Sequence, residues 1–406
     1  MIKGKNIFAV LDIGTSKISV IIVKRNFTND CEILAMSTAE SSGIRSGKVI
    51  NLEAAKDSII NVIDLAENEA DVRVKNVFVS LNSSFLISSR NSQDLNLANQ
   101  EIELKDLNKM LFQVLEKYDK QEVEIVHTIP YEYILDSSRG IVHPEGLFGN
   151  KLTGFFHIIC APANYLINIT KCLEKCQLSV EGYIASGFAS AIASLRQDEM
   201  EFGAAVIEIG GGAATISVFY KNNLIFTEGV PYGGIHITND IAKVLNLDVA
   251  VAEKIKLAHG SVYSMNGIID NIINVENDEI GEKTIINQSE LNEIIKARLE
   301  EVLNLLKNKV LEADMMEVIS KIVVVGGSST IIGINELVWQ IFGKKSRTGA
   351  VEEIDNIKPN FFNASFVTVA GMYKNIEQIR IYNSKDIYND KKGLLNRLWG
   401  WFKDNF

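Results

Sequence analysis

Two short glycine-containing segments, each preceded by an acidic residue, are the parts of this 406-residue sequence best suited to chemistry. The first holds an acid, a glycine, two hydroxyls and a lysine: Asp12, Gly14, Thr15, Ser16 and Lys17. The second holds an acid and three glycines: Glu208, Gly210, Gly211 and Gly212. Glycine lets successive backbone N–H groups point into one concavity, which is how many loops bind phosphate. Both segments therefore predict turns that bind a phosphate-bearing ligand.

The first turn adds side-chain groups that suit a nucleotide with its metal. Lys17 could reach phosphate oxygens, and the Asp12 carboxylate could hold a magnesium ion through water. For this turn alone, a plain hairpin with an exposed lysine is an alternative of equal weight.

Two further glycine pairs lie later in the chain. Gly326 and Gly327, followed by Ser328, end an apolar run, which predicts a strand whose tip a base or ribose could approach closely. Gly233 and Gly234 precede a predicted helix whose N-terminus could face phosphate. On the next predicted helix, Glu253 and Lys256 lie one turn apart; they could bond ribose hydroxyls, or they could form a solvated ion pair.

The elements that carry the two acidic turns follow one plan. Apolar, β-branched runs at 7–13, 18–23 and 31–37 predict three strands, and the plan recurs at 204–209, 215–220 and 224–230. Helical pattern follows each set. The duplication predicts two similar α/β halves that face each other.

Composition limits the function classes. The formal net charge of −10 argues against a sequence-independent nucleic-acid binder, which needs a basic face. The four cysteines are too few and too scattered for a disulfide framework, and for Cys172 and Cys176 buried small side chains are favoured over a metal site. Neither a signal-peptide pattern nor an apolar run long enough to span a membrane occurs, so the expected compartment is cytoplasmic.

The end of the chain, KKGLLNRLWGWFKDNF (391–406), differs from the rest. At 100° per residue, its large apolar side chains fall within an arc of roughly 160°: Leu394, Leu395, Leu398, Trp399, Trp401, Phe402 and Phe406. Four cations accompany them: Lys391, Lys392, Arg397 and Lys403. This pattern predicts an amphipathic helix lying in the interface of an anionic membrane.

In chain order, these signals resemble the superfamily of actin, Hsp70 and sugar kinases. Within it, the sequence is most similar to the FtsA family of bacterial cell-division proteins. The stretches that carry this likeness are SGIRSGKVINLEAAKDSI (42–59), HTIPYEYILD (127–136), GIVHPEGLFG (140–149), 228–260, GMYKNIEQ (371–378) and LWGWFKDNF (398–406).

The resemblance implies an α/β, actin-like two-lobed fold with duplicated ribonuclease-H-like halves. The first core would comprise 1–81 and 160–190, with an α+β subdomain inserted at 82–159. The second core would comprise 191–230 and 309–360, with a smaller nucleotide- and partner-binding subdomain at 231–308. A return helix at 361–379, a linker at 380–390 and the amphipathic helix at 391–406 would follow.

Ligands and partners also follow from the resemblance. It implies that the protein binds ATP and magnesium. The implied partners are further copies of the chain in head-to-tail filaments, anionic inner-membrane lipids, later division proteins and the acidic tail of the tubulin-like FtsZ. The implied location is the cytoplasmic face of the inner membrane at the division site. Lys296 and Arg298, on a helix predicted at 289–311, could meet that acidic tail, although solvated surface charge is the commoner role of such residues. No nucleic-acid partner is expected.

The second turn departs from the family pattern. FtsA-like proteins usually carry an Asp, three glycines, two threonines and another Asp, whereas here Glu208 precedes the glycines and Ala213 and Ala214 follow them. The extra methylene moves the carboxylate of Glu208, the candidate catalytic residue, by about 1 Å. We therefore expect ATP binding with weak or absent hydrolysis, unless neighbouring residues replace the lost groups.

Two alternatives share the fold. A small-molecule kinase would need a carboxylate base in a closed cleft and would have little use for an amphipathic tail. A pilus-assembly-type actin-like scaffold would not need the tryptophan-rich end of this chain.

Overall fold

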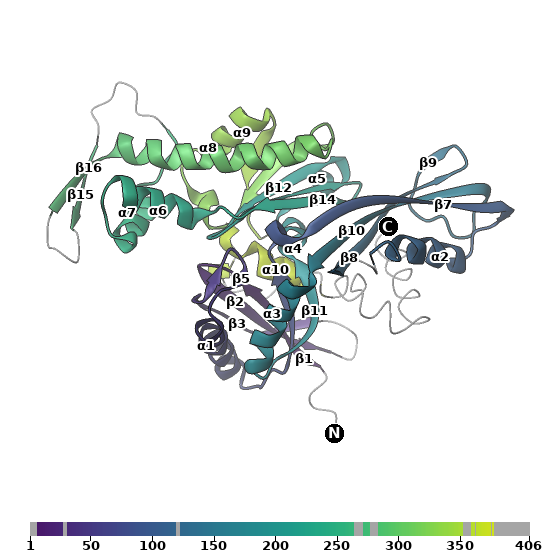
Figure 1. Cartoon of the computed structure of the whole chain (residues 1–406), viewed down its shortest axis with the longest axis horizontal. Helices are drawn as coiled ribbons and strands as arrows, with labels where there is room; N and C mark the ends of the chain where they lie inside the picture. Colours follow the sequence, from purple (N-terminus) through teal and green to yellow (C-terminus); the bar gives the residue numbers. More distant parts are fainter. Residues whose placement is uncertain are drawn as a thin grey trace.

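The computed structural model describes residues 6–26, 31–118, 122–263, 271–276, 283–351, 359–361, 363–374 and 376. Two five-stranded sheets form two lobes, one below the other in Figure 1, and a four-stranded sheet extends to the right of the upper lobe. The linker predicted at 380–390 and the amphipathic helix predicted at 391–406 lie outside the described residues.

The first lobe is a mixed sheet with the strand order β11-β6-β1-β2-β3. Its strands are β1 (Ile7–Ile13), β2 (Lys17–Arg25), β3 (Cys31–Glu40), β6 (Asn76–Leu81) and β11 (Ser179–Ala185). β1, β2 and β3 form an antiparallel meander, and β6 and β11 extend it in parallel from β1. The middle residues of β1 and β2 are fully buried, as expected for β-branched runs covered on both faces.

Helices and one small hairpin complete this lobe. The helices are α1 (Leu52–Ala70), α3 (Ala163–Lys175) and α4 (Ser186–Ser194), and the hairpin pairs β4 (Ile44–Arg45) with β5 (Lys48–Val49). α1 begins where the Asn51 side chain accepts a hydrogen bond from the Ala54 N–H, and it ends at Asp71, whose backbone is left-handed.

The second lobe repeats the first strand for strand. Its order, β18-β17-β12-β13-β14, has the same meander and the same two parallel strands. The strands are β12 (Ala204–Ile209), β13 (Ala214–Tyr220), β14 (Asn223–Val230), β17 (Lys321–Val325) and β18 (Lys345–Thr348). All six predicted strands are confirmed, with ends within three residues of the prediction.

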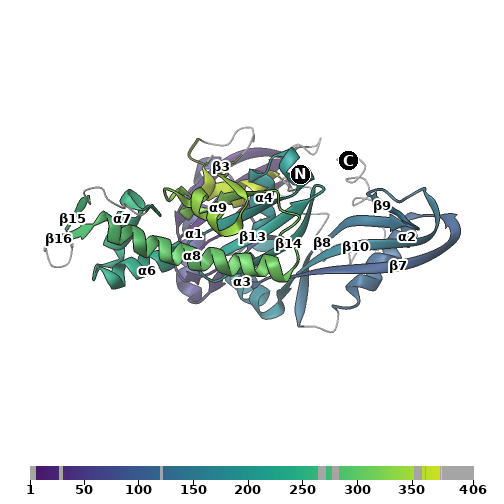
Figure 2. The ribbon, with the colours of Figure 1, turned by 90° about the horizontal axis from the view of Figure 1, so that it is seen from above.

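Further helices cover the second lobe and extend it to the left in Figure 1. They are α5 (Gln197–Phe202), α8 (Gln288–Glu312) and α9 (Ile334–Phe342) on the sheet, and α6 (Gly234–Val244) and α7 (Val249–His259) beyond it, next to the hairpin β15 (Ile272–Glu276)–β16 (Lys283–Asn287). α8 runs along the top of the lobe and joins the two parts (Figures 1 and 2). The helix predicted at 289–311 is α8.

The inserted subdomain lies between β6 and α3 in the chain. Its sheet has the order β7-β10-β8-β9, with β7 (Ile87–Glu101), β8 (Val123–Leu135), β9 (Ser138–Ile141) and β10 (Phe148–Pro162), and it is covered by α2 (Leu104–Leu115). α2 buries Leu107, Met110, Leu111 and Val114. The predicted α+β insert is confirmed.

Although the insert interrupts the first lobe, it is bonded to the second. His157, fully buried in β10, donates from Nδ1 to the carbonyl of Leu224 in β14 at 2.8 Å and accepts from the Ser88 hydroxyl at 2.8 Å. The same hydroxyl accepts from the Thr227 N–H at 3.2 Å. Burial lowers the pKa of His157 to about 4, so the neutral ring that this pattern needs is the stable one.

The lobes are joined where α4 meets α10 (Val367–Lys374). A Cβ at Gly371 would overlap the carbonyl oxygen of Ala189, so only glycine permits this approach. Three short 3₁₀ turns lie near the joint: η2 (Gly327–Thr330), η3 (Pro359–Phe361) and η4 (Ala364–Phe366); a fourth, η1 (Ser83–Phe85), follows β6.

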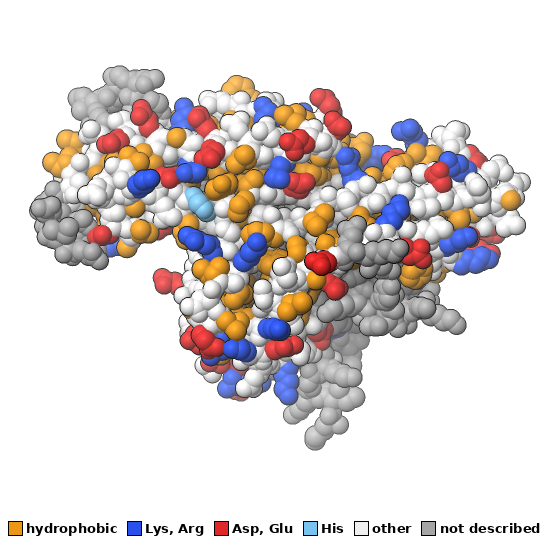
Figure 3. Space-filling model, viewed as in Figure 1, with side chains coloured by type: hydrophobic (Ala, Val, Ile, Leu, Met, Phe, Trp, Pro, Cys, Tyr) orange, Lys and Arg blue, Asp and Glu red, His pale blue; other side chains and the backbone are white. Residues whose placement is uncertain are grey.

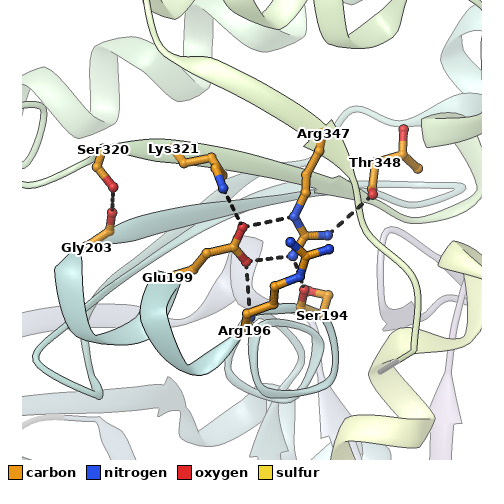
Figure 4. A network of polar contacts seen from close by, with 8 residues as sticks. All are labelled: Ser194, Arg196, Glu199, Gly203, Ser320, Lys321, Arg347 and Thr348. Carbon is orange, nitrogen blue, oxygen red and sulfur yellow. Dashed lines mark hydrogen bonds and ion pairs between the residues drawn. The ribbon is translucent and has the colours of Figure 1, made fainter. Parts of the chain in front are cut away.

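A buried ion network fixes the edge of the second sheet (Figure 4). Glu199 of α5 accepts from Arg347 of β18 at 2.6 and 2.9 Å and from Lys321 of β17 at 3.1 Å. Burial alone would raise the pKa of Glu199, but these bonds and one from the Arg196 N–H outweigh it and lower the pKa to about 2. The network anchors β18 and lies outside the glycine turns.

Candidate functional site

The first turn is the hairpin between β1 and β2. The Gly14 N–H donates to the Lys17 carbonyl at 3.1 Å, which closes the turn. Asp12, at the end of β1, accepts from the Ser80 hydroxyl at 2.6 Å. Burial raises the pKa of Asp12, while the Ser80 bond and the charge of Lys17 act in the opposite direction.

Lys17 is not the fully exposed lysine of the plain-hairpin alternative. Its amine lies 3.3 Å from the centre of the Phe366 ring, and burial lowers its pKa to about 8 even though Asp12 favours the charged form. A partly desolvated ammonium next to a glycine turn interacts more strongly with an anion than a solvated one does.

The second turn has the same backbone as the first. The Gly210 N–H donates to the Ala213 carbonyl at 2.9 Å. Strand registers align the two hairpins, because Asp12 pairs with Ser19 and Glu208 pairs with Thr215. Glu208 is therefore the counterpart of Asp12.

The two turns touch each other. A Cβ at Gly211 would overlap the Ser16 hydroxyl, and one at Gly212 would overlap the Thr15 hydroxyl. The second turn is also bonded to the β4–β5 hairpin of the first lobe, because the buried Ser46 hydroxyl donates to the Gly212 carbonyl at 2.7 Å. The glycines of the second turn thus make room for the side chains of the first.

The carboxyls that precede the two turns are near enough for the charge of Asp12 to affect Glu208. Burial raises the pKa of Glu208 to about 7; the hydrogen bond from Thr368 opposes the rise, the negative charge of Asp12 adds to it, and the nearby Ser190 hydroxyl opposes it. Thr368 of α10 donates to Glu208 Oε1 at 2.6 Å. Ser190 is close enough to influence the pKa, yet its hydroxyl donates to Gly187, so Glu208 Oε2 has no hydrogen bond of normal geometry.

Magnesium fits this carboxyl pair. Two neighbouring carboxyls, one with an unsatisfied oxygen, are hard oxygen donors whose negative charges repel each other unless a cation or proton neutralises them. Asp12 and Glu208 would hold the ion, which would neutralise phosphate charge when bound. Within the described residues, no cluster of three or more His, Cys, Asp or Glu side chains suits a metal.

The glycines before α6 reach the site, but as packing elements. The N–H of Gly234 donates to the Gly210 carbonyl at 2.9 Å, and that of Ile235 donates to the Gly211 carbonyl at 2.8 Å. A Cβ at Gly233 would overlap the Gly210 carbonyl. In this arrangement the first N–H groups of α6 hold the second turn rather than facing outward, a tertiary contact that the sequence pattern did not indicate.

Glu253 and Lys256 form an ion pair at 2.6 Å, but it is not a solvated one. The Lys256 side chain is buried, and its amine also donates to the Thr238 hydroxyl at 2.8 Å and to the Gly234 carbonyl at 3.2 Å. Thr238 in turn donates to Glu253. The pair therefore lies behind the start of α6, with the carboxylate of Glu253 at the surface.

The third glycine segment lies at the tip of β17. Gly326 has φ +90°, and its Cβ would meet the Ile209 carbonyl, so it lets β17 approach the end of β12. In contrast, nothing lies within 4 Å of a Cβ built at Gly327. Ser328 is buried, and its hydroxyl lies 2.8 Å from a Cβ built at Gly234. Gly327 thus faces open space beside the turns, as a base-binding position requires.

The candidate partner residues on α8 are already engaged. Arg298 donates to Asp240 at 2.6 and 3.1 Å and to Glu301 at 2.5 Å, and Lys296 lies 3.8 Å from Glu300. On the face seen in Figure 3, acidic and basic side chains are likewise interspersed rather than gathered into a basic patch. An acidic peptide would have to compete with these carboxylates.

Sequence reasoning missed Ser80, Thr368, Phe366 and Ser46. Each meets its turn from a distant part of the chain: Ser80 is 68 residues from Asp12, and Thr368 is 160 residues from Glu208. A hydroxyl at the end of a predicted parallel strand next to β1 could have indicated Ser80. No local signal pointed to the other three.

The duplicated sheets and facing turns define an actin-like protein. In agreement, the structure is similar to that of the PilM–PilN type IV pilus biogenesis complex, with a TM-score of 0.64, 16% identity and coverage of 91% of this chain and 98% of that one. It is also similar to MreB5 of Spiroplasma citri bound to ADP, with a TM-score of 0.57, 13% identity and coverage of 95% and 99%. These likenesses concern the fold, and they confirm the predicted class.

Sequence comparison identifies the family. The model for "Cell division protein FtsA" matches residues 205–371, and that for "SHS2 domain inserted in FTSA" matches 85–160. FtsA of Borreliella burgdorferi is 30% identical over 411 residues, covering 98% of each chain, and FtsA of Agrobacterium fabrum is 29% identical over 425 residues, covering 100% of this chain and 96% of that one. The chain belongs to the FtsA family of cell-division proteins.

Proposed function

We propose that this FtsA-family protein binds ATP with magnesium between its two glycine turns and tethers FtsZ filaments to the membrane. The proposal of ATP binding rests on one observation: two matching turns contact each other and together present one lysine, two carboxyls and free backbone donors. The fold supports it as well, because the similar MreB5 structures are bound to ADP and AMPPNP.

Each part of a nucleotide has a counterpart in the site. Lys17 and the backbone N–H groups of Thr15 and Ser16 suit phosphates, and Asp12 with Glu208 suits magnesium. The open space at Gly327 suits the base, and the exposed carboxylate of Glu253 suits a ribose hydroxyl. Lys256, which is bonded to three groups, orients that carboxylate.

Calorimetry with ADP and AMPPNP, with and without magnesium, tests this proposal. Lys17→Met keeps the apolar stem but removes the charge, so we expect at least a tenfold loss of affinity, corresponding to about 1.4 kcal/mol, the low end of a charged hydrogen bond. Lys221→Met, on the far end of the second lobe, is the matched control. Unchanged affinity in Lys17→Met would place the nucleotide elsewhere.

Gly327→Val separates base binding from folding. No atom lies within 4 Å of the new side chain's Cβ, so the melting temperature should change little, whereas adenine nucleotides should bind more weakly. If Gly327→Val binds ATP normally, the base does not approach this strand tip.

The site supports binding more than hydrolysis. With a pKa of about 7, Glu208 is only about half ionised at pH 7, and Ala213 and Ala214 supply no hydroxyl to position a water molecule, so the second turn offers few groups for hydrolysis. We expect fewer than about one phosphate released per minute, far below typical enzyme turnover. A phosphate-release assay with magnesium ATP that gives faster turnover would show that neighbouring residues replace the lost groups.

Membrane tethering would depend on residues 391–406, which lie outside the described residues. Within the described residues, none of the helices is both long enough and apolar enough to cross a bilayer. Each cation of the tail would contribute about 1 kcal/mol at an anionic surface, and each buried large apolar side chain about 1.5–3 kcal/mol before ordering costs. A single tail would bind reversibly, and several tails on one filament would bind firmly.

Flotation with anionic liposomes tests the tether. Deleting 391–406 should release the protein while leaving nucleotide affinity unchanged. Retention of the deletion variant on the liposomes would reject this anchor.

FtsZ and the chain itself are the proposed partners, with later division proteins expected on the insert. Head-to-tail contacts between two-lobed subunits do not close, so they produce open filaments. Co-sedimentation with FtsZ and with lipid separates this function from a pilus-assembly-type scaffold and from a small-molecule kinase. A Lys296→Glu variant should weaken FtsZ binding if the acidic tail docks on α8.

A further inference from the structure

The Lys17 amine lies directly against the Phe366 ring. The 3.3 Å from the Lys17 amine to the ring centre is well inside the roughly 6 Å within which cation–π attraction is counted. The two residues come from opposite ends of the chain, so the contact is a product of the fold. It covers one side of the only cation in the two turns.

The ring is held by the segment that returns the chain from the second lobe to the first. Phe366 ends η4, whose first residue, Ala364, accepts a hydrogen bond from the Gly326 N–H at 2.8 Å. The Phe361 ring packs against Phe366 with a centroid distance of 4.5 Å. The ring position is therefore tied to the glycine tip of β17.

The same segment contacts the second turn's carboxyl. Two residues after Phe366, Thr368 donates to Glu208 Oε1 at 2.6 Å, and α10 then packs closely on α4 through Gly371. Residues 364–368 thus contact the β17 tip through the Ala364 carbonyl, the Lys17 amine through the Phe366 ring and the Glu208 carboxyl through the Thr368 hydroxyl.

From this geometry we infer that Phe366 is a positioning residue for phosphate binding, a role that rests on the proposed nucleotide-binding function. The ring supports the Lys17 ammonium from one side and holds it beside the first turn. An ammonium has three N–H donors, so contact with a ring on one side leaves donors for phosphate oxygens. Through η4, the position of the cation depends on the glycine strand that faces the base.

Affinity for ligands with and without phosphate tests the inference. In Phe366→Leu, ADP and AMPPNP should bind about 2- to 30-fold more weakly, the range that cation–π contacts span, while adenosine, which lacks phosphate, should change by less than about 2-fold. Phe366→Tyr keeps the ring and should retain wild-type affinity. Tyr220→Leu, which removes the looser contact with Lys221 at 5.3 Å, is the matched control and should have no effect.

A second measurement does not require nucleotide. Competitive acetylation at varied pH, read by peptide mass spectrometry, reports the titration of Lys17. The wild-type midpoint should lie near the pKa of about 8 and should fall in Phe366→Leu, because the ammonium loses the ring's stabilisation while it stays buried. The Lys17 midpoint should return to the wild-type value in Phe366→Tyr, which keeps an aromatic ring. If the ring served only to fill space, the midpoint would not depend on an aromatic side chain at this position.

The outcomes are distinct. An unmoved midpoint in Phe366→Leu, or an equal loss for adenosine and ADP, overturns the inference. If the wild-type protein binds no adenine nucleotide while the midpoint still falls, the Lys17 contact stands and the proposed nucleotide function fails. A thermal melt of each variant separates these results from loss of folding.

Discussion

The two glycine turns have the same backbone hydrogen-bond pattern but different side chains. Both hairpins close with a glycine N–H donating to the carbonyl three residues on, and both follow an acid at the same register. The first turn carries Thr15, Ser16 and Lys17, whereas the second carries only glycine and alanine at the matching positions. Since side chains on both turns would overlap, one turn supplies the side-chain groups and the other supplies space and backbone donors.

The acids differ in the source of their hydroxyl partner. Asp12 is bonded to Ser80, from the neighbouring strand of its own sheet. The matching position in the second sheet is Val325, so Glu208 is bonded instead to Thr368 on the helix that joins the lobes. The acid of the first turn therefore has its hydroxyl partner within its own lobe, while the acid of the second turn depends on the joint. A change at the joint should therefore be felt first at Glu208.

The largest expected effect comes from filling the space between the turns. Gly212→Ala would overlap the Thr15 hydroxyl and crowd the Ser46 N–H at 2.9 Å, so we expect about 3 kcal/mol of destabilisation, at the upper end for overpacking. Gly210→Ala is the matched control, since its Cβ meets only the Ala213 carbonyl, at 3.3 Å.

Thermal melts and ADP titrations of the two variants measure this difference. If Gly210→Ala and Gly212→Ala lose the same stability and affinity, the absence of a side chain at Gly212 is not what accommodates the first turn.

An intermediate effect is expected from pH. Because the folded pKa of Glu208, about 7, exceeds its ordinary value of 4.5, the folded state favours the protonated form. Its contribution is complete below pH 4.5 and is lost as the pH rises through 7, at a cost of about 2 kcal/mol between pH 5 and pH 8. Glu208→Gln should flatten this dependence in urea unfolding curves recorded at both pH values, without added magnesium. An equally steep fall in the variant would assign the pH dependence to other groups.

The smallest effects should come from removing each acid's hydroxyl partner. Thr368→Val leaves Glu208 without its hydrogen bond, so the protein should lose about 1 kcal/mol and the pH transition assigned to Glu208 should move upward. Ser80→Ala should cost about the same, because Asp12 and Glu208 are buried to a similar degree and each loses one hydroxyl donor, but it should leave that transition in place. A shift of the same size in both variants would mean that the two carboxyls titrate as one coupled pair.

Much of the fold could be predicted because its signals are local. The runs at 7–13 and 204–209 are apolar and β-branched, and glycines follow them at once, so strand and turn are both encoded within a few residues. The spacing of Leu107, Leu111 and Val114 likewise indicated α2. The duplication of the strand pattern was enough to predict two matching lobes.

Less of the site could be predicted. The sequence placed Gly233 and Gly234 near phosphate, but it did not indicate that the first N–H groups of α6 are bonded to the second turn. It also did not distinguish a solvated Glu253–Lys256 ion pair from one at the binding site. The burial of Lys256 behind α6 excludes the solvated pair. Nor did it indicate that the insert, placed by the chain in the first lobe, is bonded to the second through His157.

By itself, then, the sequence determined which residues could form phosphate-binding turns and that a tight hairpin joins the first two strands of each lobe, because glycine geometry and side-chain alternation act over a few neighbouring positions. Only the tertiary structure decided which groups surround those turns. Ser80, Phe366 and Thr368 reach Asp12, Lys17 and Glu208 from remote parts of the chain. Their contacts, and the pKa values that burial imposes there, exist only when sheet register and the crossing of α4 with α10 bring the lobes together.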